Sequence, residues 1–327
     1  MTVLVTGASG FLGRRLAEML IERGERVRLL ARPASRLDDL AGRVDGIDRC
    51  SFDDAAGLRR ALGGIDIVYH CAGHAADWGS WDTFHQANVE APRALLEAAL
   101  AVGSVKRFVH VSTTDVYGYP VIAGDETMPP TDIGLPYNRS KLRGDRLALD
   151  FGAREGLPVT VVRPATIFGP RSKDWVVELC RLLRQRVVVT LDGGHTGAGL
   201  VYVDDVAEAM MRLAALPTAI GRAVNIVDPT RMTWRAYFDA MADGIGAPRP
   251  RINLNSRLAL ALAAVSEGVY RAFRLRYRPL FTRHVVLTLC RDQNYRVDAL
   301  TALIGEFPII GLREGLSRTI VWAKDLT

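Results

Sequence analysis

Two hydrophobic periods alternate along the first two hundred residues of this chain. Short apolar runs, which predict buried parallel strands, occur at residues 3–5, 27–30, 65–70, 107–112 and 159–162. Between them apolar residues recur at helical spacing, as in Leu12, Leu16 and Leu20, and again over 91–100 and 140–153. This alternation favours an α/β fold, a doubly wound parallel sheet with helices on both faces. A ligand of such a sheet lies at the carboxyl ends of the strands.

The chain is long enough for more than one domain. Its 327 residues, 49% of them hydrophobic, suffice for one large α/β domain and a smaller one. We assign residues 1–165 and about 200–227 to the larger domain, because 202–214 has the pattern of a strand end and a helix that return to the main sheet. Residues of about 166–199 and 228–327 are expected to form a smaller, mainly helical substrate-binding domain.

The turn after the first strand carries glycines at positions 7, 10 and 13 and opens a helix. Unpaired N–H groups and the helix dipole make that helix end an anion site, and glycines let a pyrophosphate approach the backbone. A glycine-rich turn without a ligand is the alternative, but the strand–turn–helix context favours dinucleotide binding. The residues predicted to contact the cofactor here are Gly7, Ser9, Gly10, Phe11, Leu12 and Gly13.

Composition and charge exclude several other classes of protein. The net charge of +6 comes without a basic stripe interleaved with aromatic residues, so we expect no nucleic-acid partner. The four cysteines have no Cys-x-x-Cys spacing, which predicts free thiols, no metal site and a reducing, cytoplasmic location. We expect no cleaved signal, and no apolar run approaches the roughly 18 residues of a membrane-spanning helix.

A phenol and an ammonium occupy one face of a predicted helix, at Tyr137 and Lys141. A nearby ammonium lowers the pKa of a phenol toward neutrality, which prepares it for proton transfer. With Thr113 on a preceding strand, Tyr-x-x-x-Lys and the Gly-x-x-Gly-x-x-Gly turn resemble the short-chain dehydrogenase/reductase superfamily, and Gly-Phe-Leu-Gly resembles its extended branch. The resemblance implies that Thr113, Tyr137 and Lys141 are catalytic, and that Asn88 organises the active-site helix and contacts the cofactor.

The end of the second strand indicates which nicotinamide cofactor is preferred. Enzymes that use NAD place an acidic residue there to bind the ribose, whereas Ala31 occupies that position in this chain. Arg32 follows, with Arg36 one turn later, and a guanidinium binds a 2′-phosphate through charge-assisted hydrogen bonds. We therefore predict NADP(H) in preference to NAD(H), the alternative being that these arginines are merely solvated.

The resemblance implies further cofactor contacts at the ends of later strands. Ser51 stands where the family usually has an aspartate that meets the adenine, and Pro164 opens the segment that covers the nicotinamide carboxamide. The expected contacts in these segments are Ser51, Phe52, Cys71, Ala72, Gly73, Asn88, Tyr137, Lys141, Pro164, Ala165 and Thr166.

Departures from the family pattern narrow the classes of substrate that we expect. Nucleotide-sugar epimerases usually have Asn and Arg where this chain has Thr166 and Ala198, and sugar dehydratases have an acid at the position of Thr114. An epimerase or dehydratase therefore remains the alternative, with a non-catalytic NADP-sensing protein as a third possibility. The late segments 279–284 and 295–300 resemble the 3β-hydroxysteroid dehydrogenase-like group, which includes 2-alkyl-3-ketoacid reductases. We expect an NADP(H)-dependent oxidoreductase that interconverts a secondary alcohol and a ketone on a bulky apolar substrate, of 3β-hydroxysteroid, sterol or β-keto/hydroxy acid type.

Two aromatic or aliphatic segments are candidates for the substrate pocket and for partner contacts. The loop that holds Trp78 and Trp81 is expected near the pocket mouth, and the aliphatic run 254–265 suggests an apolar lid. Residues 258–265 also suit peripheral membrane contact, because a cluster of arginines follows them. Burial of this helix against the main domain or in a homodimer is the alternative. The arginines in question are Arg271, Arg274, Arg276 and Arg278.

Overall fold

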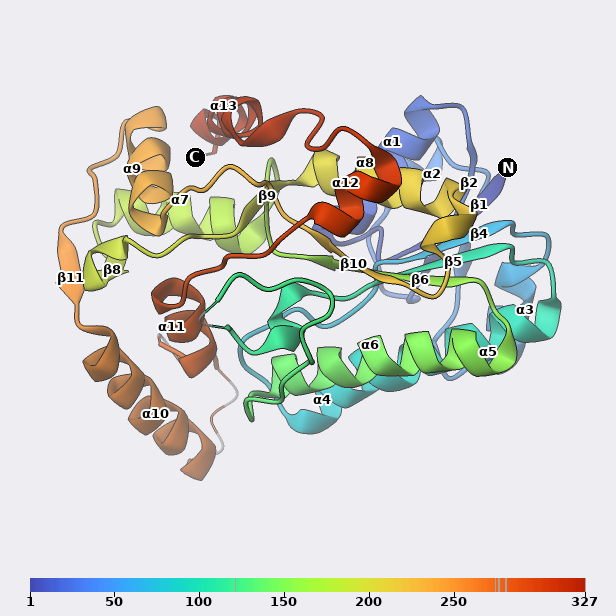
Figure 1. Cartoon of the computed structure of the whole chain (residues 1–327), viewed down its shortest axis with the longest axis horizontal. Coiled ribbons are helices and arrows are strands. Elements are labelled where there is room, and N and C mark those ends of the chain that lie inside the picture. Colours follow the sequence, from blue (N-terminus) through green and yellow to red (C-terminus); the bar gives the residue numbers. More distant parts are fainter. Residues whose placement is uncertain (121, 274, 276, 280, 327) are drawn as a thin grey trace.

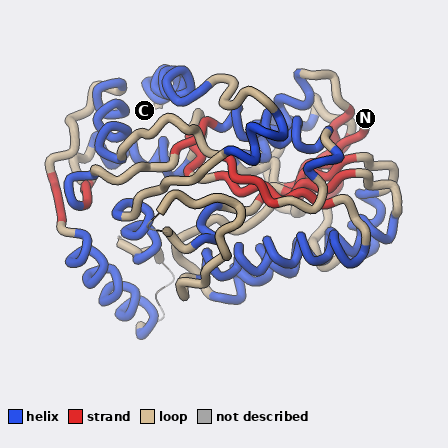
Figure 2. The backbone as a smooth tube through the Cα atoms, in the orientation of Figure 1, coloured by secondary structure: helices blue, strands red, loops and turns tan. Residues whose placement is uncertain are grey.

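The computed structural model describes residues 1–120, 122–273, 275, 277–279 and 281–326. A seven-stranded parallel sheet in the order β10-β6-β5-β4-β1-β2-β3 forms its centre (Figures 1 and 2). The strands are β1 (Thr2–Thr6), β2 (Arg26–Ala31), β3 (Gly46–Arg49), β4 (Ile67–His70), β5 (Arg107–Val111), β6 (Val159–Pro164) and β10 (Ala223–Ile226). The strand order reverses between β1 and β4, as in other doubly wound sheets. The predicted fold class is confirmed.

Helices cover both faces of this sheet, because successive side chains of each strand point to opposite faces and are buried on both. Leu4 of β1 packs with α3 (Ala55–Leu62), α5 (Ala91–Val102) and α6 (Pro136–Glu155). Val3 and Val5 pack on the other face with α1 (Phe11–Glu22) and α8 (Val203–Ala215). Figure 1 shows these two helical layers on either side of the strands.

The smaller part of the chain consists of helices and two short parallel ladders. The ladders are β7 (Thr166–Phe168) with β9 (Leu200–Tyr202), and β8 (Val189–Leu191) with β11 (Ile252–Leu254).

The α-helices of the described chain not yet named include two that lie between strands of the main sheet, α2 (Asp38–Ala41) and α4 (Trp81–His85). The others are α7 (Leu179–Arg184), α9 (Trp234–Gly244), α10 (Ser256–Ala272), α11 (Arg283–Cys290), α12 (Asp298–Ile304) and α13 (Gly311–Lys324). Within the described ranges no helix is long and apolar enough to cross a membrane.

The chain returns to the main sheet as expected, but not through the strand at 200–202. β9 pairs with β7 in a separate ladder, and β10 is the strand that joins β6 at the sheet edge. Between them α8 packs on α1, where the Asp204 carboxylate accepts hydrogen bonds from Arg15 at 2.7 and 3.0 Å. Asp205 accepts from the N–H groups of residues 309–311, which fixes the C-terminal segment over α8.

Candidate active site

The glycine turn lies between β1 and α1, pressed against the end of β4. Gly7 has a φ of +74°, and a Cβ there would lie 2.7 Å from the Ala72 nitrogen. A Cβ on Gly13 would lie 2.5 Å from the Gly7 carbonyl oxygen. Gly10 caps α1, whose described first turn holds no side-chain cap and no acidic residue. The first N–H groups of this helix are thus available to an anion, with Ser9, Phe11 and Leu12 beside them.

The end of β2 borders a cavity of about 510 Å³. The residues that line it are Ser9, Arg32, Pro33, Ala34, Ser35 and Arg36. Both predicted phosphate-binding arginines therefore face the same space as the glycine turn. The sequence analysis missed Arg49 at the end of β3, which donates to the carbonyls of Pro33 at 3.0 Å and Ser35 at 2.9 Å. Arg49 shapes this loop, and only strand pairing reveals it.

The end of β4 completes the cofactor side of the site. The Thr6 hydroxyl accepts a hydrogen bond from the Ala72 N–H at 3.0 Å and contacts His70 Nδ1 at 2.8 Å, so β1 and β4 end in register. Cys71 is half-buried beside the glycine turn, and Gly73 lies where a Cβ would be 3.0 Å from Asn88 Oδ1. Ser51 and Phe52 follow β3, with the Phe52 ring edge-on to His70 at 5.8 Å. His70 is fully buried in the sheet.

Asn88 sits in a π-helical turn, Gln86–Glu90, inserted between α4 and α5. Such turns are rare and occur often at functional sites. The Asn88 amide donates to the His74 carbonyl at 3.1 Å and to the Ser140 hydroxyl at 2.9 Å, while its oxygen accepts from the His74 N–H at 2.7 Å. It thereby ties the loop after β4 to α6, the helix that carries Tyr137 and Lys141.

The predicted catalytic side chains come together where β5 ends and α6 begins. Thr113 caps the short helix Thr114–Tyr117 after β5, and its hydroxyl lies close enough to the Tyr137 phenol to lower the pKa of that phenol. Lys141, one turn along α6, donates to the Val111 carbonyl at 2.7 Å. Asn138 Nδ2, between the two, donates to the Asp115 carbonyl at 2.6 Å and so fixes α6 against this loop.

Burial dominates the electrostatics of this group. It lowers the pKa of the Lys141 ammonium to about 8, so the side chain is still mainly protonated at pH 7. Burial and the Asp115 carboxylate raise the pKa of Tyr137 above its ordinary value, and the Thr113 contact lowers it. We predicted that Lys141 lowers the pKa of Tyr137, whereas burial is the largest influence on that pKa in the structure and raises it. A neutral phenol has an O–H that can donate to an oxygen acceptor.

The segment after β6 closes the site from the other side. Pro164 ends β6, and the N–H groups of Ala165 and Thr166 donate to the carbonyls of Ile226 at 3.0 Å and Gly199 at 2.8 Å. These peptide donors are therefore already bonded within the protein. The predicted cofactor residues lie in the glycine turn and the start of α1, in the segments after β2, β3 and β4, at the end of β6, and on the helical segments 86–90 and 136–155.

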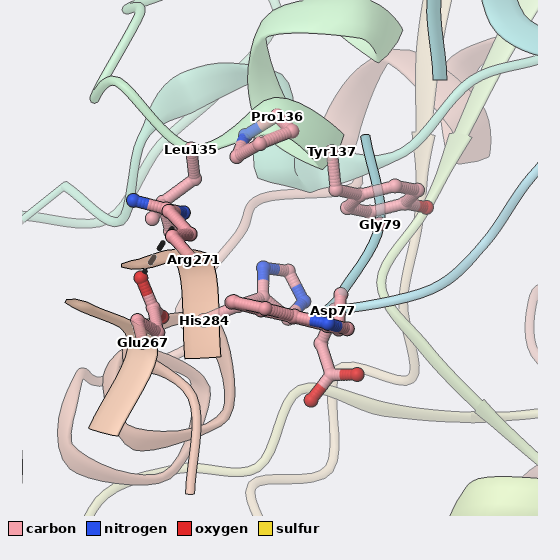
Figure 3. Close-up of a pocket in the computed structure, with 9 residues that line it drawn as sticks. Asp77, Gly79, Leu135, Pro136, Tyr137, Glu267, Arg271 and His284 are labelled. Carbon is pink, nitrogen blue, oxygen red and sulfur yellow. Dashed lines mark hydrogen bonds and ion pairs between the residues drawn. The ribbon is translucent and has the colours of Figure 1, made fainter. Parts of the chain in front are cut away.

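A small pocket opens beside Tyr137, between α6, the loop after β4, α10 and α11 (Figure 3). Its volume of about 10 Å³ is close to that of one water probe. The residues that line it are Asp77, Trp78, Gly79, Leu135, Pro136, Tyr137, Glu267, Arg271 and His284. Trp78 lies at the pocket as expected. Trp81 does not, because its ring packs under Arg143 at 4.9 Å.

The expected apolar lid is wrong in its orientation. Helix α10 passes the pocket, but it turns Glu267 and Arg271 toward it. Leu258, Leu262 and Val265 face outward and are 53%, 51% and 65% exposed. The aliphatic run could not reveal this, because at helical spacing its small alanines, not its leucines, lie on the packed face.

The described arginines at the end of α10 and after it have partners within the protein. Arg271 pairs with Glu267 at 3.2 Å and lies over the Trp78 ring at 5.4 Å. Arg278 donates to both oxygens of Asp77, at 2.6 and 2.7 Å. These contacts hold the loop after β4 to the C-terminal part of the chain. Arg274 and Arg276 lie outside the described residues.

Sequence comparison decides the family of this site. The family model described as NAD dependent epimerase/dehydratase family matches residues 3–226, most of the chain and all of the main sheet. The chain belongs to this family. The match confirms the predicted extended short-chain dehydrogenase/reductase resemblance, and with it an NAD(P)-dependent enzyme of dehydrogenase/reductase type.

Members of this family that resemble the chain along its whole length have several named activities. A 2-alkyl-3-oxoalkanoate reductase of Stenotrophomonas maltophilia is 30% identical, with 97% of this chain and 98% of that protein covered. Sterol demethylase protein B of Methylococcus capsulatus is 31% identical, with 99% of each covered. The crystal structure of UDP-glucuronic acid 4-epimerase from Bacillus cereus, with UDP-glucuronic acid and NAD, has a TM-score of 0.79 at 22% identity over all of both chains. The last likeness shows the fold alone.

Proposed function

We propose that this protein is an NADP(H)-dependent oxidoreductase that interconverts a secondary alcohol and a ketone on a bulky apolar substrate, of 3β-hydroxysteroid, sterol or β-keto/hydroxy acid type. The convergence of Thr113, Tyr137 and Lys141 beside the pocket carries the proposal. The family match and the two full-length relatives named for a reductase and a sterol demethylase support it. Residues 1–165 with 200–227 would bind the cofactor, and 166–199 with 228–327 the substrate.

The side chains have separate tasks in this reaction. The Thr113 hydroxyl aligns the substrate oxygen, and Tyr137 exchanges the proton with it. Lys141, held at the Val111 carbonyl, would supply positive charge to the phenol and would hold the nicotinamide ribose. Asn88 keeps α6 and the loop after β4 in place. A bound nicotinamide would donate or accept the hydride.

The residues present fit a phosphorylated dinucleotide. The glycine turn leaves no room for a Cβ at Gly7 or Gly13, and helix α1 begins beside the arginine-lined cavity. The β2 end offers Ala31 in place of an acidic residue, so no carboxylate at that position repels a 2′-phosphate. Arg32 and Arg36 would hold that phosphate.

Arg32→Ala is expected to lower the affinity for NADP⁺ by roughly ten- to hundredfold, because a charge-assisted bidentate contact is worth about 1.5–3 kcal/mol. Affinity for NAD⁺ should stay within about twofold, since NAD⁺ has no 2′-phosphate. Calorimetric titration of both cofactors measures this, with Arg154→Ala at the far end of α6 as the control. Equal dissociation constants of the two cofactors for the wild type would contradict the preference.

A screen of NADPH oxidation against steroid, β-keto acid and aromatic ketones tests the reaction class. We expect turnover with at least one of them and none with nucleotide sugars. Turnover of a nucleotide sugar by protein that retains its cofactor would instead establish an epimerase or dehydratase. Absence of turnover with every ketone, combined with tight NADPH binding, would favour a sensing protein.

The exposed face of α10 is a candidate surface for contact with a membrane that holds an apolar substrate. Five apolar side chains on that face are Leu258, Leu262, Val265, Val269 and Phe273, between 44% and 74% exposed. The opposite face lines the pocket through Glu267 and Arg271. We propose that this stripe contacts an anionic membrane surface, because a net charge of +6 attracts such lipids and opposes a second copy of the chain.

Val265→Glu is expected to abolish sedimentation with phosphatidylserine-rich vesicles at low salt, because it places a charge in the apolar stripe. Val321→Glu, at an equally exposed valine on α13, is the matched control and should leave binding unchanged. Wild-type binding should fall as salt rises, since the Debye length shrinks to about 8 Å at 0.15 M. Protein that stays in the supernatant at every salt concentration, or a homodimer that Val265→Glu dissociates, would overturn the proposal.

A further inference from the structure

His284 is a pocket residue that the proposed mechanism does not use. It lies in the first turn of α11, and its ring stands edge-on to Tyr137 with 5.3 Å between the ring centres. The Tyr119 ring lies 6.4 Å away on another side. Figure 3 shows His284 and Tyr137 facing the same space. The side chain is 17% exposed, so its polar atoms are largely removed from water.

The two ring nitrogens of His284 have different surroundings. Nε2 lies 3.7 Å from a carboxylate oxygen of Asp115. Nδ1 is buried and has no hydrogen-bond partner within the described part of the chain. A buried polar nitrogen without a partner is costly and calls for an explanation. A doubly protonated imidazole donates from both nitrogens, so a ring whose Nε2 faces the Asp115 carboxylate can donate from Nδ1 to an anion.

The other ionisable side chains of this pocket already have partners. Asp77 accepts from Arg278 at 2.6 Å and from the Thr282 hydroxyl at 2.7 Å. Glu267, 3% exposed, accepts from the Arg283 N–H at 2.7 Å and pairs with Arg271. Both carboxylates are thus neutralised by neighbours. Among the described ionisable side chains that line the pocket, His284 is the one with a buried polar atom that lacks a hydrogen-bond partner.

We propose that His284 Nδ1 binds the carboxylate of a 3-oxo or 3-hydroxy acid, with Asp115 holding the imidazole as a positioning residue. In such a substrate the carboxyl carbon is two bonds from the carbon that exchanges the hydride. A substrate oxygen at Tyr137 therefore places the carboxylate within reach of the neighbouring imidazole. This inference rests on the proposed alcohol–ketone reaction and selects, among its substrates, acids over neutral sterols.

The test compares oxidation of a 2-alkyl-3-hydroxyalkanoate and of its methyl ester with NADP⁺. His284→Phe keeps an aromatic ring against Tyr137 but removes the donor. It should lower kcat/KM for the acid by roughly ten- to hundredfold, mainly through KM, as expected for loss of a charge-assisted hydrogen bond. The kcat/KM for the ester should change by less than about twofold. His85→Phe, a histidine outside the pocket lining, is the matched control, and His284→Leu, which also lacks a donor, serves if the Phe variant does not fold.

An equal loss of kcat/KM for the acid and the ester would mean that His284 has only a structural role, which contradicts the inference. An unchanged kcat/KM for the acid would also overturn it. Calorimetric binding of a long-chain alkanoate and its methyl ester separates this from failure of the proposed function. The wild-type protein could show no turnover and still bind the acid more tightly than the ester. If His284→Phe then loses this difference in affinity, the inference holds although the proposed reaction does not. Wild-type protein that binds acid and ester equally overturns the inference.

Discussion

Tyr137→Phe is expected to lower kcat by about a hundred- to ten-thousandfold, the range that a positioned general acid or base contributes. The phenylalanine keeps the ring that packs between Phe84 and His284, at centre distances of 6.4 and 5.3 Å, so the pocket retains its shape. Cofactor affinity should change little, because the glycine turn and the β2 loop lie elsewhere on the sheet edge. Single-turnover absorbance at 340 nm and calorimetric titration of NADPH measure the two quantities.

Tyr237→Phe provides the matched control for this variant. Its phenol donates to the Trp175 carbonyl at 2.8 Å in the core of the smaller part of the chain, far from the proposed proton transfer. We expect kcat within about twofold of wild type there, even if stability falls. Near-normal turnover by Tyr137→Phe with the true substrate would show that the phenol does not exchange the proton.

Asp145→Asn is expected to destabilise the fold by about 3–5 kcal/mol, the cost of leaving one partner of a buried ion pair uncompensated. Asp145 is 0% exposed and accepts from Arg163 Nε at 2.9 Å and from its terminal nitrogen at 2.6 Å. Arg163, on β6, also donates to the Tyr117 hydroxyl at 2.8 Å. Since residues 137, 141 and 145 share one face of α6, this pair holds the catalytic face of the helix against the sheet.

Asp243→Asn is the control for the buried pair. Arg249 donates to both oxygens of Asp243, at 2.7 and 2.6 Å, so the pair has the same bidentate arrangement. Its side chains are 51% and 58% exposed, however, and an exposed pair contributes about 0–1 kcal/mol. Urea unfolding of the two variants measures the difference. Equal losses of stability would mean that burial does not set the energy of the Asp145 pair.

Five of the seven strands of the main sheet and the glycine turn were predictable from sequence because their signals are local. A buried parallel strand must be apolar along its whole length, and a helix that covers it must be apolar at every third or fourth residue. The five predicted strands are present with ends shifted by at most two residues. The glycine turn is equally local, since Gly7 and Gly13 are required by contacts that the turn makes with itself and with the adjoining strand end. Tyr137 and Lys141 share a face because any helix places them there.

The tertiary structure alone decided what surrounds that site. Arg49 reaches the loop of Arg32 only because β3 pairs with β2. Helix α10 has two faces, and packing of its alanines, not its hydrophobicity, turns the leucines to solvent and Glu267 to the pocket. His284 lies 147 residues after Tyr137 in sequence, and no periodicity connects them. Local patterns record which side of an element is buried, whereas the partner that buries it is chosen by contacts between segments far apart in the chain.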